Sequence, residues 1–97
     1  MKKPDNLTGA ASAKFDEMVA LWSRVLSPSD AAMVADYCRA FVRQSEAEQK
    51  IEEFGTVVIG ANGVPTQSVW LAVSDREGKT MRSIAALISK RRTAPKQ

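Results

Sequence analysis

The chain has no histidine and only one cysteine among its 97 residues. Without histidine it lacks the commonest general base and the commonest metal-ligating side chain. A single cysteine excludes an intrachain disulfide and fits a reducing compartment. Cys38 lies in a helical pattern between Tyr37 and Phe41, with no neighbour that would lower its pKa. We therefore expect a buried apolar residue there rather than a nucleophile.

Long hydrophobic runs are also missing. No apolar run approaches the ~20 residues that span a bilayer, and no apolar segment follows Lys2 and Lys3 as it would in a secretory signal. We therefore expect a cytoplasmic protein with no membrane partner. The sequence contains no phosphate-binding loop, nucleophile elbow or zinc-ligand spacing. We predict no catalytic residues, no metal and no cofactor, and hence a protein that is not an enzyme.

Charge is distributed unevenly along the chain. Residues 1–66 hold seven Lys or Arg against nine Asp or Glu, whereas residues 67–97 hold seven Lys or Arg against two Asp or Glu. The net charge is therefore −2 in the first part and +5 in the second. This asymmetry indicates a polyanionic partner for the C-terminal third and another role for the rest.

Apolar spacing predicts three helices, at residues 12–26, 28–54 and 69–90. Ser27, Pro28 and Asp30 form a helix start signal, Gly55 suits a helix C-terminus, and Ser68 can cap the third helix. Val57, Val58 and Ile59 favour a strand, and Asn62-Gly63 favours a tight turn. We predict a mainly α fold, a helical hairpin plus a C-terminal helix, with a short β-hairpin or extended arm inserted between helices two and three. It forms a single domain at 12–92, after a flexible lead at 1–11 and before a polar tail at 93–97.

The second helix is longer than a domain of this size needs, and its apolar stripe changes face halfway. The first half should pack against helix one. Two alternatives remain for the second half. Either it projects and meets another copy of the chain, or the helix is kinked or shorter than its apolar pattern predicts. Under the first alternative, the self-association surface comprises Ala47, Ile51, Phe54, Val57, Val58 and Ile59.

The basic residues of the third helix form a candidate contact surface for DNA phosphates, comprising Lys79, Arg82, Lys90, Arg91 and Arg92. Solubility and the helix dipole explain such cations equally well. A helix-turn-helix built from the first two helices is rejected, because the second helix carries three basic and six acidic residues. A recognition helix needs positive charge to neutralise phosphates. Any DNA contact from the third helix would therefore position the protein without reading sequence.

The order of these motifs resembles the P27-like family of phage terminase small subunits over about residues 12–90. The resemblance rests on Leu21-Trp22, Tyr37-Cys38, Ile51-Glu52-Glu53-Phe54-Gly55, Val57-Val58, Asn62-Gly63 and Pro65, followed by a basic amphipathic helix. The chain departs from the family pattern at residues 87–95, where a Leu-Gly-Leu-Thr-Pro-like segment and an arginine are usual. The role of this terminal segment stays open.

The resemblance implies a non-enzymatic subunit in the cytoplasm of a bacterial host. Such proteins form ring-shaped homo-oligomers, engage double-stranded viral DNA and hand it to the large terminase subunit, which carries the ATPase and nuclease. The residues leave two other functions open. One is a small dimeric DNA-binding regulator, similar to a transcription factor or an antitoxin. The other is an interaction module whose basic residues only keep it soluble.

Overall fold

The structure is a computed structural model that describes residues 1–60 and 63–93, and describes Val58, Arg92 and Thr93 by their backbone alone. Within these residues it is mainly helical, as predicted. The elements in chain order are α1 (Gly9–Leu21), a short 3-10 helix η1 (Pro28–Asp30), α2 (Ala31–Phe54), β1 (Val57–Ile59), β2 (Pro65–Gln67) and α3 (Val69–Thr93).

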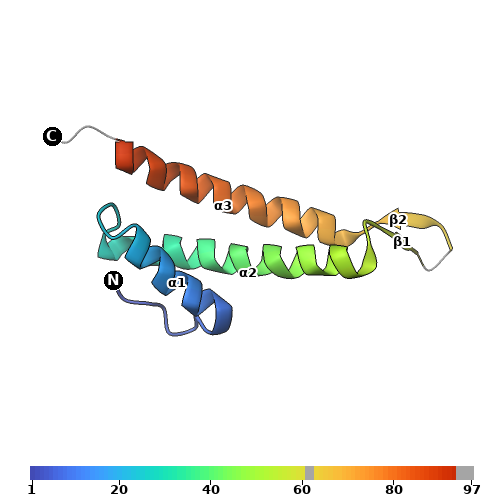
Figure 1. Cartoon of the computed structure of the whole chain (residues 1–97), viewed down its shortest axis with the longest axis horizontal. Coiled ribbons are helices and arrows are strands. Elements are labelled where there is room, and N and C mark those ends of the chain that lie inside the picture. The colour runs from blue at the N-terminus through green and yellow to red at the C-terminus, as the bar shows by residue number, and fades with distance from the viewer. Residues whose placement is uncertain (61–62, 94–97) are drawn as a thin grey trace.

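The long helices α2 and α3 run antiparallel, side by side, and α1 packs against the N-terminal half of α2 (Figure 1). Helix α2 is uninterrupted to Phe54, so the alternative of a shorter second helix is wrong. Its C-terminal half does not project alone, because α3 packs along it. The Gln44 amide donates a hydrogen bond to the Ser74 carbonyl at 3.3 Å. Helix α1 covers only the N-terminal half of α2, whereas α3 packs along both halves, so the apolar stripe on α2 changes face beyond the contact with α1.

The hydrophobic core lies at the end of the molecule where all three helices meet. Cys38 is part of it, with its sulfur 3.6 Å from the Met18 sulfur. Burial raises the pKa of the Cys38 thiol to about 11, because a thiolate is disfavoured in apolar surroundings. This confirms the expected buried, unreactive cysteine. The core cluster comprises Leu7, Ala11, Phe15, Met18, Val34, Ala35, Cys38, Ile84 and Ile88.

Three local signals in the sequence define where the helices start and end. The Asp30 carboxylate accepts a hydrogen bond from the Ser27 N–H at 2.8 Å, which satisfies a donor at the start of the helix. Gly55 ends α2 with φ +83°, a conformation that favours glycine. Ser68 Oγ accepts the Trp70 N–H at 3.3 Å at the start of α3. The roles of Gly55 and Ser68 were predicted, whereas the first start signal was predicted with Ser27 as the cap and not with Asp30 as the acceptor.

The bounds of the first helix were wrong. It was expected at 12–26, but α1 runs from Gly9 to Leu21. Trp22, Val25 and Leu26 form a turn, in which the Val25 and Leu26 N–H groups both bond the Trp22 carbonyl. Their side chains still pack on the core, so the apolar spacing continues past the end of the helix. At the other end, the segment expected to be a flexible lead contributes Leu7 to the core.

The predicted insert is a two-stranded antiparallel hairpin that extends from the end of the helical pair (Figure 1). Its strands align Val57 with Gln67 and Ile59 with Pro65. Gly63 has φ +79° and donates its N–H to the Gly60 carbonyl at 2.9 Å. The Asn62 half of the expected Asn-Gly turn lies outside the described residues.

The described molecule is elongated, with extents of 61 × 30 × 17 Å. Its radius of gyration is 16.9 Å, whereas a compact domain of about 100 residues has a radius of ~13 Å. The excess comes from the helical pair and hairpin, which extend beyond the core. Among the described residues, no helix is both long and apolar enough to cross a membrane.

Candidate functional site

The outer face of α3 carries two of the five predicted DNA contacts. Lys79 and Lys90 are exposed and stand eleven residues, or three helical turns, apart, which places them on one face about 16 Å from each other. Lys79 lies 3.3 Å from Asp75 in an exposed ion pair. Such pairs contribute only ~0–1 kcal/mol, so this pairing leaves Lys79 able to meet another anion.

Arg82 is used differently. Its guanidinium folds back over Gly78, where an added Cβ would lie 3.2 Å from Arg82 Nη1 and 2.8 Å from Gln44 Nε2. Glycine at 78 therefore allows these two polar side chains to lie close to the α3 backbone. A glycine inside a helix costs about 1 kcal/mol relative to alanine, so the sequence alone indicates only that Gly78 weakens α3. The reason for a glycine at 78 is the Gln44 side chain of α2, which lies 34 residues earlier in the chain. The spacing of residues within α3 does not reveal such a distant neighbour.

The C-terminal cations of α3 do not form one continuous edge. Arg91 turns toward the start of α2, and its Nη1 donates to the Asp30 carboxylate at 2.7 Å. Asp30 is nearly buried, so this contact joins the end of α3 to η1. The predicted contact at Arg92 has a side chain outside the described part of the structure. Of the five predicted contacts, the structure places Lys79 and Lys90 together on the outer face.

The Asp30–Arg91 contact predicts a pH-dependent effect. The hydrogen bond from Arg91, and then the one from the Ser27 N–H, lower the pKa of Asp30 below 3.8. A carboxyl with a lowered folded-state pKa stabilises the fold above its unfolded-state pKa of about 3.9, and this contribution disappears as the pH falls through the folded-state value. We expect Asp30→Asn to lower the melting temperature at pH 7 and to have a smaller effect at pH 3.

Thermal melts of wild type and Asp30→Asn at pH 7, 5 and 3 measure this difference. Asp36→Asn serves as the matched control, because Asp36 belongs to an exposed i,i+3 pair with Arg39 at 3.3 Å. We expect the control to change the melting temperature little. A loss in Asp30→Asn that is equally large at pH 3 would show that the ion pair is not its cause.

The structure buries some of the predicted self-association residues and leaves others exposed. Ala47 is fully buried within the chain, so its assignment to an intermolecular surface is wrong. It lies three residues beyond Gln44, on the face of α2 that meets α3. Ile51 is half-buried, and the side chain of Val58 lies outside the described part. Phe54, Val57 and Ile59 are exposed.

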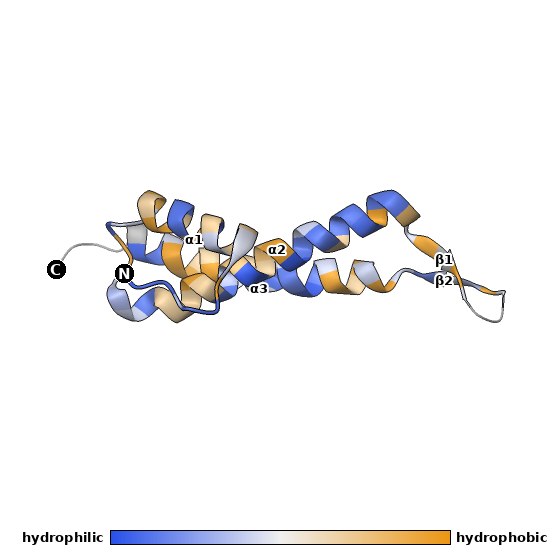
Figure 2. Ribbon diagram, turned by 90° about the horizontal axis from the view of Figure 1, so that it is seen from below, coloured by the Kyte–Doolittle hydropathy of each residue, from blue (hydrophilic) through white to orange (hydrophobic). Residues whose placement is uncertain are grey.

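Two further apolar side chains complete this exposed end, and the sequence analysis missed both. Val64 precedes β2 and Val69 begins α3, and each is more than half exposed. Apolar colouring gathers at β1 and the adjoining helix end (Figure 2). We call this set the apolar tip; its members are between 53% and 72% exposed and comprise Phe54, Val57, Ile59, Val64 and Val69.

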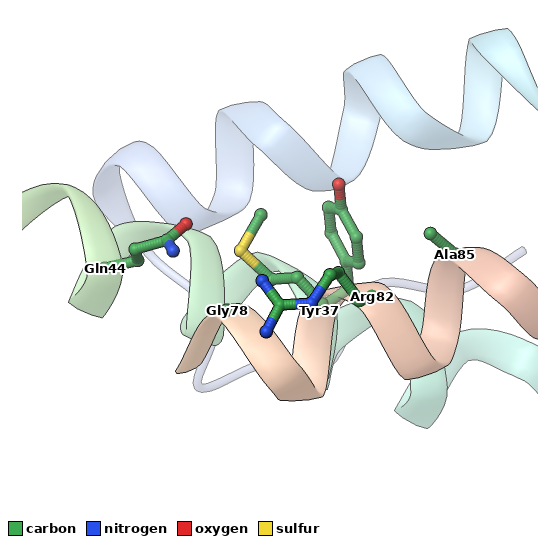
Figure 3. A pocket seen from close by; sticks show the side chains of 6 residues that line it. Tyr37, Gln44, Gly78, Arg82 and Ala85 are labelled. Carbon is green, nitrogen blue, oxygen red and sulfur yellow. The ribbon is translucent and has the colours of Figure 1, made fainter. Parts of the chain in front are cut away.

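A groove of about 200 Å³ lies between α2 and α3. Tyr37 and Gln44 line it from α2, and Gly78, Met81, Arg82 and Ala85 line it from α3 (Figure 3). Tyr37 is held by an edge-on contact with Trp22, with ring centroids 6.2 Å apart. The groove walls are mostly apolar, with the Arg82 guanidinium as the one charged group.

A second buried carboxylate of the described chain forms ion pairs within the protein. Glu77 is buried, and its carboxylate lies 3.4 Å from Arg76 Nε and 3.9 Å from Arg43 Nη1. Over residues 1–60 and 63–93, no three or more His, Cys, Asp or Glu side chains gather in a way that could hold a metal ion.

Comparison with known proteins decides the family. The profile described as "phage terminase, small subunit" matches residues 11–89, which is most of the chain. The chain belongs to the phage terminase small subunit family. The finer assignment to the P27-like group stays a prediction. Searches of curated proteins and of solved structures found no match.

Membership in the terminase small subunit family implies a role in phage DNA packaging. It also implies association with DNA and with the large terminase subunit, and small subunits of this family are generally non-catalytic. The matched region runs from the start of α1 to near the end of α3. It therefore includes the apolar tip, the groove, Lys79 and Arg82.

Proposed function

We propose that this chain is a non-catalytic packaging subunit that self-associates, engages double-stranded viral DNA and assists the large terminase subunit in the cytoplasm of a bacterial host. The observation that carries the proposal is the elongated shape, with an apolar tip left uncovered at one end, in a member of this family. The assembly is a homo-oligomer, and a ring is the closed form that fits packaging.

Self-association is supported by the apolar tip. Five large apolar side chains at the hairpin end are each more than half exposed, and such exposed patches mark interaction sites. A two-stranded hairpin is also marginal in water on its own, and its outer edges can pair with another strand. A neighbouring copy that packs against this end would cover the apolar side chains and stabilise the hairpin.

DNA engagement is supported by the positive charge of α3. Lys79 and Lys90 present cations on the outer face. We include Arg92 as a third phosphate contact because of its position in the sequence. Arg91 has a lesser role, because its guanidinium is already paired with Asp30, and so does Arg82, because its guanidinium folds back over Gly78. Residues 79–92 include no aromatic residue that could stack on a base, so we propose that these lysines bind phosphates and do not read bases.

Salt-dependent binding to duplex DNA tests this function. Fluorescence anisotropy with a labelled duplex should show the logarithm of affinity falling linearly with the logarithm of salt concentration, with a slope of about −0.9 per phosphate contact. With two lysines per copy, we expect a slope of about −2 or steeper. Absence of binding at low salt, or binding that salt does not change, would contradict the proposed DNA role.

A further inference from the structure

The groove between α2 and α3 has the size of a single side chain. Its volume of about 200 Å³ is below the roughly 300–1,000 Å³ of pockets for drug-sized ligands. An apolar cavity of about 150 Å³ is large enough to hold one benzene ring. The groove therefore has room for one aromatic side chain.

Phe54 is an exposed aromatic side chain that would fit it. It is 58% exposed at the C-terminal end of α2, and it is the one aromatic residue among the exposed large apolar side chains of the described chain. Lys50 Nζ lies 5.5 Å from the centroid of its ring, and the neighbouring Glu52 and Glu53 are exposed. Aromatic side chains that enter a pocket dominate the energy of many interfaces.

The Phe54 end carries a carboxylate that is opposite in charge to the groove, in addition to the Lys50 ammonium that lies over the ring. The groove offers Tyr37, Met81 and Ala85 as apolar walls and the Arg82 guanidinium beside them (Figure 3). Phe54 offers a ring with the Glu53 carboxylate next to it in the chain. A copy that presents the Phe54 ring to the groove therefore also brings Glu53 near it, and a carboxylate is a favoured partner of the Arg82 guanidinium.

The chain's own Phe54 cannot reach the groove. Gln44 lines the groove and lies ten residues before Phe54 on the same helix, which fixes the two about 15 Å apart. We propose that Phe54 of one copy inserts into the groove of a second copy, with Glu53 facing Arg82. This inference rests on the proposed self-association and names its contact.

The proposed contact joins two different surfaces of the same chain. Each copy offers Phe54 at one place and a groove at another, and we propose that the contact is heterologous and repeats from copy to copy. Such contacts close into a ring when the rotation between copies permits, and otherwise form an open chain. A two-fold dimer would instead form this contact twice, with Phe54 of each copy in the groove of the other, and cross-linking of a double variant would then stop at the dimer.

Cysteine cross-linking in the full chain tests the contact. Two single variants, Glu53→Cys and Ala85→Cys, are mixed at pH 7 and treated with a short bismaleimide. The natural Cys38 is buried in the core, so we expect that it does not react with the bismaleimide. We expect covalent dimers from the mixture, few from either variant alone, and a ladder of longer products from the double variant. Ser23→Cys, an exposed position on the turn after α1, replaces Glu53→Cys in the control mixture and should give no dimer.

A second measurement tests the contribution of Phe54 and of the pairing between Glu53 and Arg82. Phe54→Ala should weaken self-association about tenfold or more, as measured by sedimentation across a concentration series. Arg82→Glu and Glu53→Arg should each weaken it, and their combination should restore most of the loss. The matched control Leu21→Ala, another exposed apolar residue, should leave self-association unchanged.

Failure of this contact can be told apart from failure of the proposed function. Oligomers that form without the mixed cross-link, or single variants that cross-link by themselves, would overturn the Phe54 contact and leave packaging intact. A wild-type chain that stays monomeric would overturn both. Cross-linked oligomers that do not bind DNA would support the contact and contradict the proposed DNA role.

Discussion

Replacing Phe15 with alanine should destabilise the fold by about 3–5 kcal/mol, the cost of removing a large aromatic side chain from a packed core. Phe15 is buried where α1 meets α2, among the largest fully covered side chains of the protein. Domains of this size have only about 5–15 kcal/mol of stability in total. Urea unfolding measured by circular dichroism, at one fixed protein concentration, should show this loss.

The control for Phe15→Ala is Leu21→Ala, on the same helix. Leu21 is 71% exposed at the end of α1, so its truncation should change the unfolding free energy by less than about 0.5 kcal/mol. Fixed concentration matters because self-association would itself add stability. Similar losses in the two variants would contradict the assigned packing of α1 on α2.

Replacing Lys79 and Lys90 together with alanine should produce the second large effect, a loss of affinity for duplex DNA. If both lysines contact phosphates, Lys79→Ala with Lys90→Ala lowers the steepness of the salt dependence by about 2 per copy. The affinity for duplex DNA at low salt should fall on the order of tenfold or more. Fluorescence anisotropy over 50–200 mM salt gives both values in one series.

A variant of equal net charge provides the control for the lysine pair. Lys2→Ala with Arg24→Ala also removes two exposed cations, but both positions lie outside α3. We expect this variant to bind DNA nearly as tightly as wild type, with an unchanged salt slope. Equal losses in the two double variants would show that total charge, and not the outer face of α3, governs binding.

The order of the elements followed from local signals in the sequence. The end of α2 at Gly55 and the start of α3 after Ser68 depend on residues that lie next to each other in the chain. The hairpin likewise follows from a β-branched run. The end of α1 was missed because Val25 and Leu26 continue the apolar spacing while they pack on the core from a turn.

The site was less predictable because its contacts link distant parts of the chain. Phe54, Val57 and Ile59 were identified because they form a local apolar run, but burial of Ala47 depends on how α3 packs. The Arg91 contact with Asp30 spans 61 positions. Spacing within α3 alone placed Arg91 among the phosphate contacts and gave no sign of this partner.

The central claim is that the exposed end of the helical pair is covered by sister copies. Native mass spectrometry of the full wild-type chain, over a hundredfold range of concentration, tests it most directly. We expect one assembly of several copies, which Phe54→Ala shifts toward smaller species. A wild-type chain that remains a stable 10.6 kDa monomer at the highest concentration would contradict the account.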